Sequence, residues 1–85
     1  MGSMYKDSIK EIIHRDIIKR IEELNLTQEQ TAEILGIDVR SLAYLKAGKT
    51  MCSATTLLMY LTKMCENPSE LLEKIDVTIK RLEEN

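Results

Sequence analysis

The side chains best suited to recognition chemistry lie close together in the middle of the chain. Three basic residues, Arg40, Lys46 and Lys49, follow one another there, with Tyr44 among them. An arginine presents paired N–H donors that match the acceptor pair on a guanine edge, and lysine suits a phosphate. These residue types indicate the binding of nucleic acid.

Catalysis, by contrast, has no support in the residue pattern. We find no nucleophile–base pair, metal-ligand cluster or phosphate-binding loop, so we expect no enzyme activity, metal or cofactor. Cys52 and Cys65 form no C-x-x-C pair, and His14 is far from both in sequence. We expect the cysteines to be small buried apolar side chains in a reducing cytoplasm. His14 is expected to face solvent or a partner.

Two short helices are predicted to position the recognition residues. Thr27 can cap a helix over residues 28–35, because its hydroxyl can accept from a first-turn N–H. Gly36 then ends that helix, since glycine tolerates the left-handed exit. Asp38 can cap a second helix over residues 39–47. Together the two helices would form a helix-turn-helix unit.

The apolar spacing fits this unit. Ala32 is small where the helices cross, Ile37 fills the corner, and Leu42 and Leu45 form the inner face of the second helix. An ordinary helical hairpin within a bundle would use a similar glycine turn and apolar spacing. DNA binding is the interpretation that we favour.

The same residues give the chain a resemblance to a known family. They are Leu26, Thr27, Gln28, Ala32, Leu35, Gly36, Ile37, Leu42, Leu45, Gly48, Lys49, Thr56, Leu57 and Leu61. Over residues 16–64 the chain resembles the lambda-repressor-like (Cro-type, XRE) helix-turn-helix domains, and most of all the small antitoxins and phage regulators. It departs from them at Val39, where the family often has Gln, and at Lys46, where it often has Glu.

In this docking mode the second helix enters the major groove with its N-terminal part against the bases. Arg40 would then read guanine, Val39 and Ala43 would pack against thymine methyls, and Tyr44 would line the groove or meet phosphate. Gln28, at the start of the preceding helix, would contact the DNA backbone. The full expected set is Gln28, Val39, Arg40, Ser41, Ala43, Tyr44, Lys46 and Lys49, with Ser41, Lys46 and Lys49 on phosphates.

Three further helices are predicted around this unit. The first should run over residues 6–24, with an apolar stripe of Ile9, Ile13, Ile17, Ile21 and Leu24. Ile12 and Ile18 lie off that stripe, which indicates either deeper burial or contact with a partner. The fourth helix, over residues 54–65, should bury Leu57, Leu58, Leu61 and Met64. Tyr60 is expected to be partly buried with its hydroxyl at the surface.

A start signal, Asn67-Pro68-Ser69-Glu70, precedes a last helix. Its apolar residues Leu72, Ile75, Ile79 and Leu82 alternate spacings of three and four, as in a coiled-coil seam. They could pack back on the same chain or pair with a second copy. We expect dimer contact, because the preceding four helices already resemble a complete core.

Length and composition agree with one small all-α, five-helix domain of 85 residues. We expect residues 1–3 to be a cloning scar, 4–66 the helix-turn-helix domain and 67–85 the dimerisation helix. No membrane span or secretory signal is expected. The net charge is −2, and the acidic excess falls in residues 51–85, so general attraction to phosphate should be weak.

These observations predict a cytoplasmic, sequence-specific repressor that binds a double-stranded operator as a homodimer. A homodimer implies an inverted-repeat operator. The resemblance implies a further role as an autoregulating antitoxin with a toxin protein as partner. The alternative is a protein-interaction module that has this fold without DNA binding.

Overall fold

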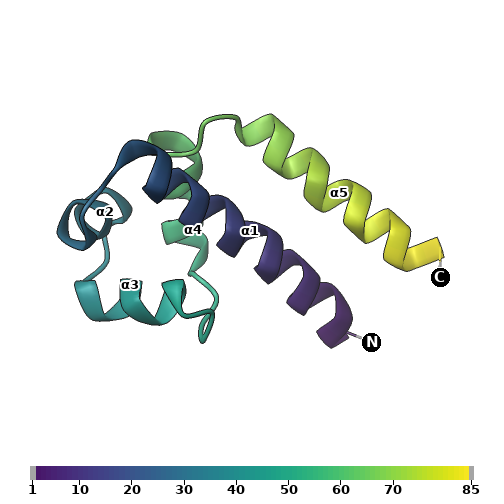
Figure 1. Cartoon of the computed structure of the whole chain (residues 1–85). Helices are drawn as coiled ribbons and strands as arrows, with labels where there is room; N and C mark the ends of the chain where they lie inside the picture. The colour runs from purple at the N-terminus through teal and green to yellow at the C-terminus, as the bar shows by residue number, and fades with distance from the viewer. Residues whose placement is uncertain (1, 85) are drawn as a thin grey trace.

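The computed structural model describes residues 2–84, and these residues form helices and connecting turns with no strand among them. The helices are α1 (Gly2–Leu24), α2 (Gln28–Leu35), α3 (Val39–Lys46), α4 (Ala54–Lys63) and α5 (Pro68–Glu84) (Figure 1). The expected all-α, five-helix architecture is confirmed. Helix α1 begins earlier than residue 6, since once a helix has formed each further residue adds a hydrogen bond.

The starts of α2 and α3 lie where their capping residues predict. Thr27 Oγ1 accepts from the Gln30 amide at 3.1 Å, and the Gln30 side chain accepts from the Thr27 amide at 2.9 Å. This reciprocal pair is a capping box. Asp38 Oδ1 accepts from the Ser41 amide at 2.6 Å. The turn between the helices depends on Gly36, whose φ of 71° is left-handed.

Two helices end earlier than expected. Helix α3 stops at Lys46 and α4 at Lys63, with Ala47 and Met64 as the respective C-cap residues. At the end of α4 the Met64 and Cys65 amides both donate to the Tyr60 carbonyl. This double use of one carbonyl closes α4 before Cys65.

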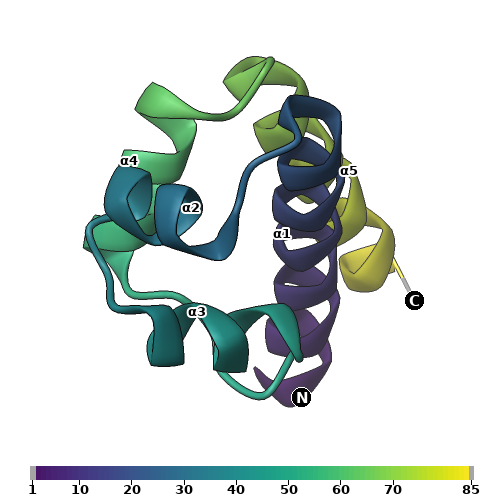
Figure 2. The ribbon, with the colours of Figure 1, turned by 60° about the vertical axis from the view of Figure 1, so that its left-hand side comes forward.

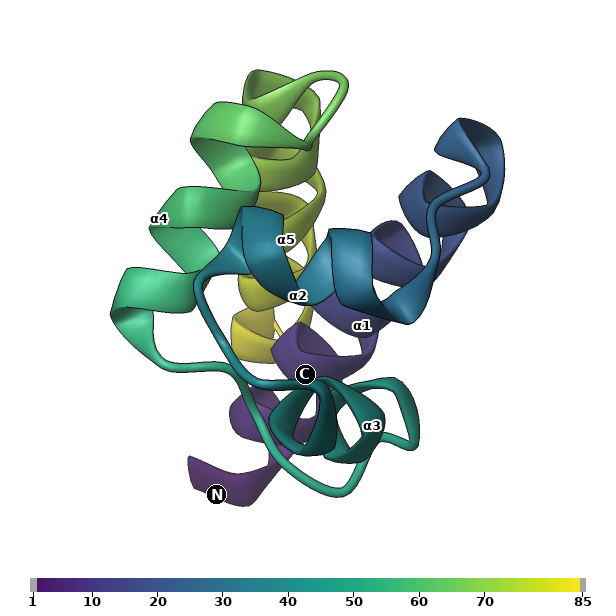
Figure 3. The same cartoon turned by 90° about the vertical axis from the view of Figure 1, so that its left-hand side faces the viewer.

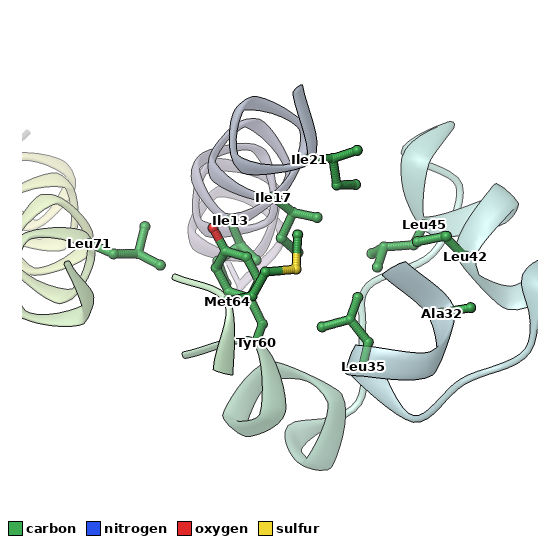
Figure 4. Close-up of a cluster of buried hydrophobic side chains, with 10 residues drawn as sticks. All are labelled: Ile13, Ile17, Ile21, Ala32, Leu35, Leu42, Leu45, Tyr60, Met64 and Leu71. Atoms are coloured by element: carbon green, nitrogen blue, oxygen red, sulfur yellow. The ribbon is translucent and has the colours of Figure 1, made fainter. Parts of the chain in front are cut away.

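All five helices contribute to one hydrophobic core (Figure 4). Its buried members are Ile13, Ile17, Ile21, Ala32, Leu35, Leu42, Leu45, Tyr60, Met64 and Leu71. Leu71 belongs to α5, and its side chain is 2% exposed. The expectation that the first four helices complete the core was therefore wrong, because the core also needs a residue of α5.

Tyr60 and Leu58 differ most from the expectations for α4. Tyr60 is fully buried, and its hydroxyl donates to Asp16 on α1. Leu58 is 60% exposed. Two residues apart on a helix lie on nearly opposite sides, so burying Tyr60 turns Leu58 toward solvent. On α1, Leu24 is likewise outside the core at 41% exposure.

Helices α1 and α5 lie side by side and run in opposite directions, so their free ends are at the same end of the molecule (Figures 1 and 2). Ile75 packs against the core, and Ile79 and Leu82 are partly buried. Only Leu72 of the expected seam is largely exposed, at 55%. Within one chain, α5 therefore turns much of its apolar face inward.

Candidate nucleic-acid interface

Helix α3 forms one edge of the molecule, with the other helices on its inner side (Figures 2 and 3). Leu42 and Leu45 are buried at 0% and 5% exposure and hold this inner side on the core. Helical spacing places the opposite side at residues 40, 43, 44 and 47, and all four are exposed. Arg40, Ala43 and Tyr44 of the predicted set therefore share one outward face.

Three predicted residues lie at the margins of this face. Val39 is 38% exposed and Lys46 is partly buried, both toward the inner side of α3. Ser41 is on the other margin, where it lines a shallow hollow with Leu45 and Met51. The Ser41 amide already donates to Asp38 Oδ1 at 2.6 Å, which holds this residue at the start of α3.

Tyr44 and Lys49 lie together at the C-terminal end of the face. The Lys49 ammonium is 6.0 Å from the centre of the Tyr44 ring, at the limit of a cation–π contact. The Lys49 amide also donates to the Tyr44 carbonyl at 3.0 Å. Lys49, which lies beyond α3 in the chain, therefore belongs to the same surface.

Gln28 is exposed at the first position of α2. The capping box holds this end of the helix, through Thr27 and Gln30. Gln30 was not among the predicted residues, although the Thr-x-x-Gln spacing is the sequence signal for its role. The Gln30 side chain is engaged with the Thr27 amide, whereas Gln28 takes no part in the capping box.

The N-terminal end of α3 carries charges of both signs. The pKa of Asp38 is lowered, mainly by the hydrogen bond from the Ser41 amide, then by the Ser41 hydroxyl, with a smaller effect of Arg40. Asp38 is therefore a carboxylate at neutral pH. It stabilises the helix start, and it also places a negative charge beside Arg40.

His14 is partly buried and is hydrogen-bonded to α3, a contact that the sequence did not predict. Its Nε2 lies 2.6 Å from the carbonyl oxygen of Lys46, the last residue of α3. A carbonyl only accepts, so Nε2 carries the proton and donates. No sequence pattern near His14 signals this contact, because its partner is a backbone atom 32 residues away.

The two cysteines are partly buried rather than fully buried. Burial is the main cause that raises the pKa of each thiol, and in Cys65 the neighbouring Asp16 carboxylate adds to it. Both thiols are therefore protonated and weakly nucleophilic at neutral pH. Between residues 2 and 84, no three His, Cys, Asp or Glu side chains are grouped as metal ligands.

The helix-turn-helix region of this chain also matches a known protein family. A helix-turn-helix family model matches residues 17–63, which is more than half of the chain. This chain is a member of the lambda-repressor-like, XRE-type helix-turn-helix family. The helix-turn-helix match spans the second part of α1 through α4 and ends before α5.

Membership makes the chain a DNA-binding regulator of the XRE type. Comparison with curated proteins and with solved structures found no match. No helix within residues 2–84 is both long and apolar enough to cross a membrane.

Proposed function

We propose that this helix-turn-helix regulator is a sequence-specific transcriptional repressor that acts by occupying its operator. The observation that supports it most is the outward face of α3. Its buried side, Leu42 and Leu45, is anchored in the core, and Arg40 is exposed near its N-terminal end. Helix-turn-helix proteins direct that end of the second helix at base edges.

The contacts follow from this placement. Arg40 would pair with the O6 and N7 atoms of a guanine, and Ala43 and Val39 would pack against thymine methyls. Tyr44 and Lys49, which contact each other, would meet the DNA backbone together. Gln28 would reach a phosphate from the start of α2, while Lys46 and the Ser41 hydroxyl would do so from the margins of the face.

Selection from a random pool of DNA duplexes tests the proposal. The full chain should enrich one sequence, which it should then bind more tightly than a scrambled duplex of the same composition in a fluorescence anisotropy titration. We expect a preference of at least about a thousandfold at physiological salt. Equal affinity for the selected and the scrambled duplex would contradict sequence-specific repression.

The repressor is proposed to be a homodimer, with the C-terminal helix residues Leu72, Ile75, Ile79 and Leu82 at or near the contact. Leu72 supports this, because a leucine with 55% exposure is available to a second copy. A two-fold dimer presents two reading helices about 34 Å apart, or a multiple of that, so its operator should be an inverted repeat. Footprinting that shows one asymmetric half-site as the tight site would argue against it.

A role as an autoregulating antitoxin rests on the resemblance alone. In that role the chain would bind a toxin protein and repress the operon that encodes both. A neighbouring toxin gene whose product co-purifies with this chain would support the role. If the chain purifies alone when it is expressed with its neighbouring genes, a regulator without a toxin is favoured.

Two observations favour a second candidate, a protein-interaction module without DNA binding. The chain has a net charge of −2, and the Asp38 carboxylate lies at the end of α3 that would approach the DNA. Both features weaken attraction to phosphate. The random-pool selection separates the two candidates, because the module would enrich no duplex.

A further inference from the structure

The end of α3 is held by a side chain from another helix. Three carbonyls near its C-terminus, those of residues 43, 44 and 45, accept hydrogen bonds from backbone amides that follow them in the chain. The donors are the amides of Ala47, Lys49 and Gly48, respectively, each at 3.0 Å. The next carbonyl along the chain, that of Lys46, accepts from His14 Nε2 on α1 at 2.6 Å. Carbonyls at a helix end need partners from outside the helix, and His14 supplies one.

This bond links the last residue of α3 to α1, one residue beyond the core contact of Leu45. Helix α3 contacts α2 more extensively than it contacts α1. Its core contacts are Leu42, near its middle, and Leu45, the residue directly before Lys46, and the turn through Gly36 holds its other end. In Figure 2 the C-terminal end of α3 lies beside α1, where His14 reaches it.

We infer that His14 is a positioning residue for base recognition, which it serves by fixing the orientation of α3 relative to α1. This inference rests on the proposed function, since it assigns a role only if α3 reads DNA. Without the bond, α3 can rotate slightly about Leu42 and Leu45. Arg40 lies six residues from Lys46, about 9 Å along the helix axis, so it moves when the far end is released.

Such a movement should affect base reading more than phosphate binding. A bidentate arginine–guanine pair needs both N–H···acceptor distances within about 2.7–3.2 Å. A lysine–phosphate contact has no such directional requirement, because the ammonium acts as a point charge. Loss of the His14 bond should therefore lower the ratio of specific to non-specific affinity.

Substitutions of His14 can separate its hydrogen bond from its bulk. His14→Leu removes the donor and keeps a side chain of similar size. His14→Gln places an amide N–H near the position of Nε2, whereas His14→Asn carries the same group one methylene too short. Thr62→Val is the matched control, because the Thr62 hydroxyl bonds only to carbonyls of its own helix, at 2.8 and 3.3 Å.

The experiment measures affinity for the duplex selected by the wild-type chain and for its scrambled version. For His14→Leu and His14→Asn we expect the specificity ratio to fall about threefold to tenfold, as for the loss of one hydrogen bond. His14→Gln should restore most of the ratio, and Thr62→Val should not change it. The inference would be overturned if His14→Leu and Thr62→Val had the same specificity ratio. It would also be overturned if the specificity ratio of His14→Gln were no higher than that of His14→Asn.

Two controls keep the outcomes distinct. Circular dichroism shows whether each variant is folded, and the Gln-to-Asn comparison still decides if the Leu variant is not. The NMR chemical shift of the Lys46 carbonyl carbon reports the hydrogen bond from His14 in the absence of DNA. This shift should change in His14→Leu and His14→Asn but not in His14→Gln. A wild-type chain that selects no duplex refutes the proposed function, whereas a Lys46 shift that is unchanged in His14→Leu refutes the bond itself.

Discussion

The Tyr60–Asp16 pair shows how much a single contact can matter in a small core. Tyr60 is fully buried on α4, and its hydroxyl donates to Asp16 Oδ2 on α1. Cys65 Sγ lies 3.6 Å from the same oxygen. The carboxylate therefore depends on Tyr60 for its main donor within the protein, and the pair connects two helices that are distant in sequence.

Removing that hydroxyl should destabilise the protein. Tyr60→Phe keeps the ring but leaves a partly buried carboxylate without its main donor, and the free energy of unfolding should fall by about 1–3 kcal/mol. Tyr44→Phe is the control, since Tyr44 is 47% exposed. Urea denaturation of both variants measures the difference. Equal stabilities would show that the Tyr60–Asp16 bond contributes nothing.

The same pair predicts an alkaline loss of stability. Burial is the largest cause that raises the pKa of Tyr60 far above its ordinary value, and Asp16 raises it further. A group whose pKa is higher in the folded state contributes its full stabilisation of the fold below its unfolded pKa. For tyrosine that pKa is about 10, so the contribution of Tyr60 is lost as the pH rises above about 10. Urea midpoints of the wild type should fall above about pH 10, and those of Tyr60→Phe should fall less steeply. Parallel curves would contradict this assignment.

At the scale of elements, the turn between α2 and α3 depends on the backbone of Gly36. Its φ of +71° strains any residue with a Cβ, yet a Cβ built there meets nothing within 4 Å. Gly36→Ala should therefore destabilise by about 1–2 kcal/mol from the backbone alone. Gly36→Asn should destabilise less, because asparagine tolerates the left-handed region better. Thermal unfolding that finds Asn as harmful as Ala would indicate a steric cause.

The sequence predicted these central elements well because their signals are local. Thr27, Gly36 and Asp38 determine where α2 and α3 begin or end, and each acts on backbone groups within a few residues. Leu42 and Leu45 were expected inside and are buried. The outward face of α3 follows from the same periodicity, so helical spacing alone was enough to place Arg40, Ala43 and Tyr44 on it.

The remaining features depend on contacts that no local pattern reveals. The partner of the Tyr60 hydroxyl is 44 residues away, and that of His14 is 32 residues away. Burial of Tyr60 turned Leu58 outward, although its apolar character had predicted the reverse. The sequence also left two positions open for α5, because a stripe with spacings of three and four looks the same whether it packs on α1 or on a second copy.

For the whole molecule, the homodimer can be tested at a position that the core does not need. Leu72→Lys should shift the mass measured by sedimentation equilibrium toward the monomer while the chain remains folded, because Leu72 is exposed. Ile75 packs against the core, so Ile75→Lys should unfold the chain instead.

Leu58→Lys is the control for this test, since Leu58 is also largely exposed but lies on α4. It should leave the mass unchanged. A Leu72→Lys variant that stays dimeric would place the contact elsewhere, and a wild-type chain that is monomeric at all concentrations would exclude the homodimer.

The central claim is that the outward face of α3 reads DNA sequence, and two substitutions test it most directly. Arg40→Ala and Lys49→Ala are titrated by fluorescence anisotropy against the selected duplex and its scrambled version at several salt concentrations. Arg40→Ala should lose about 1–3 kcal/mol on the selected duplex only and relax the preference at one base position. Lys49→Ala should weaken both duplexes alike and reduce the salt slope by about one. If Arg40→Ala instead weakens both duplexes equally, Arg40 contacts a phosphate, and α3 does not read the bases through this face.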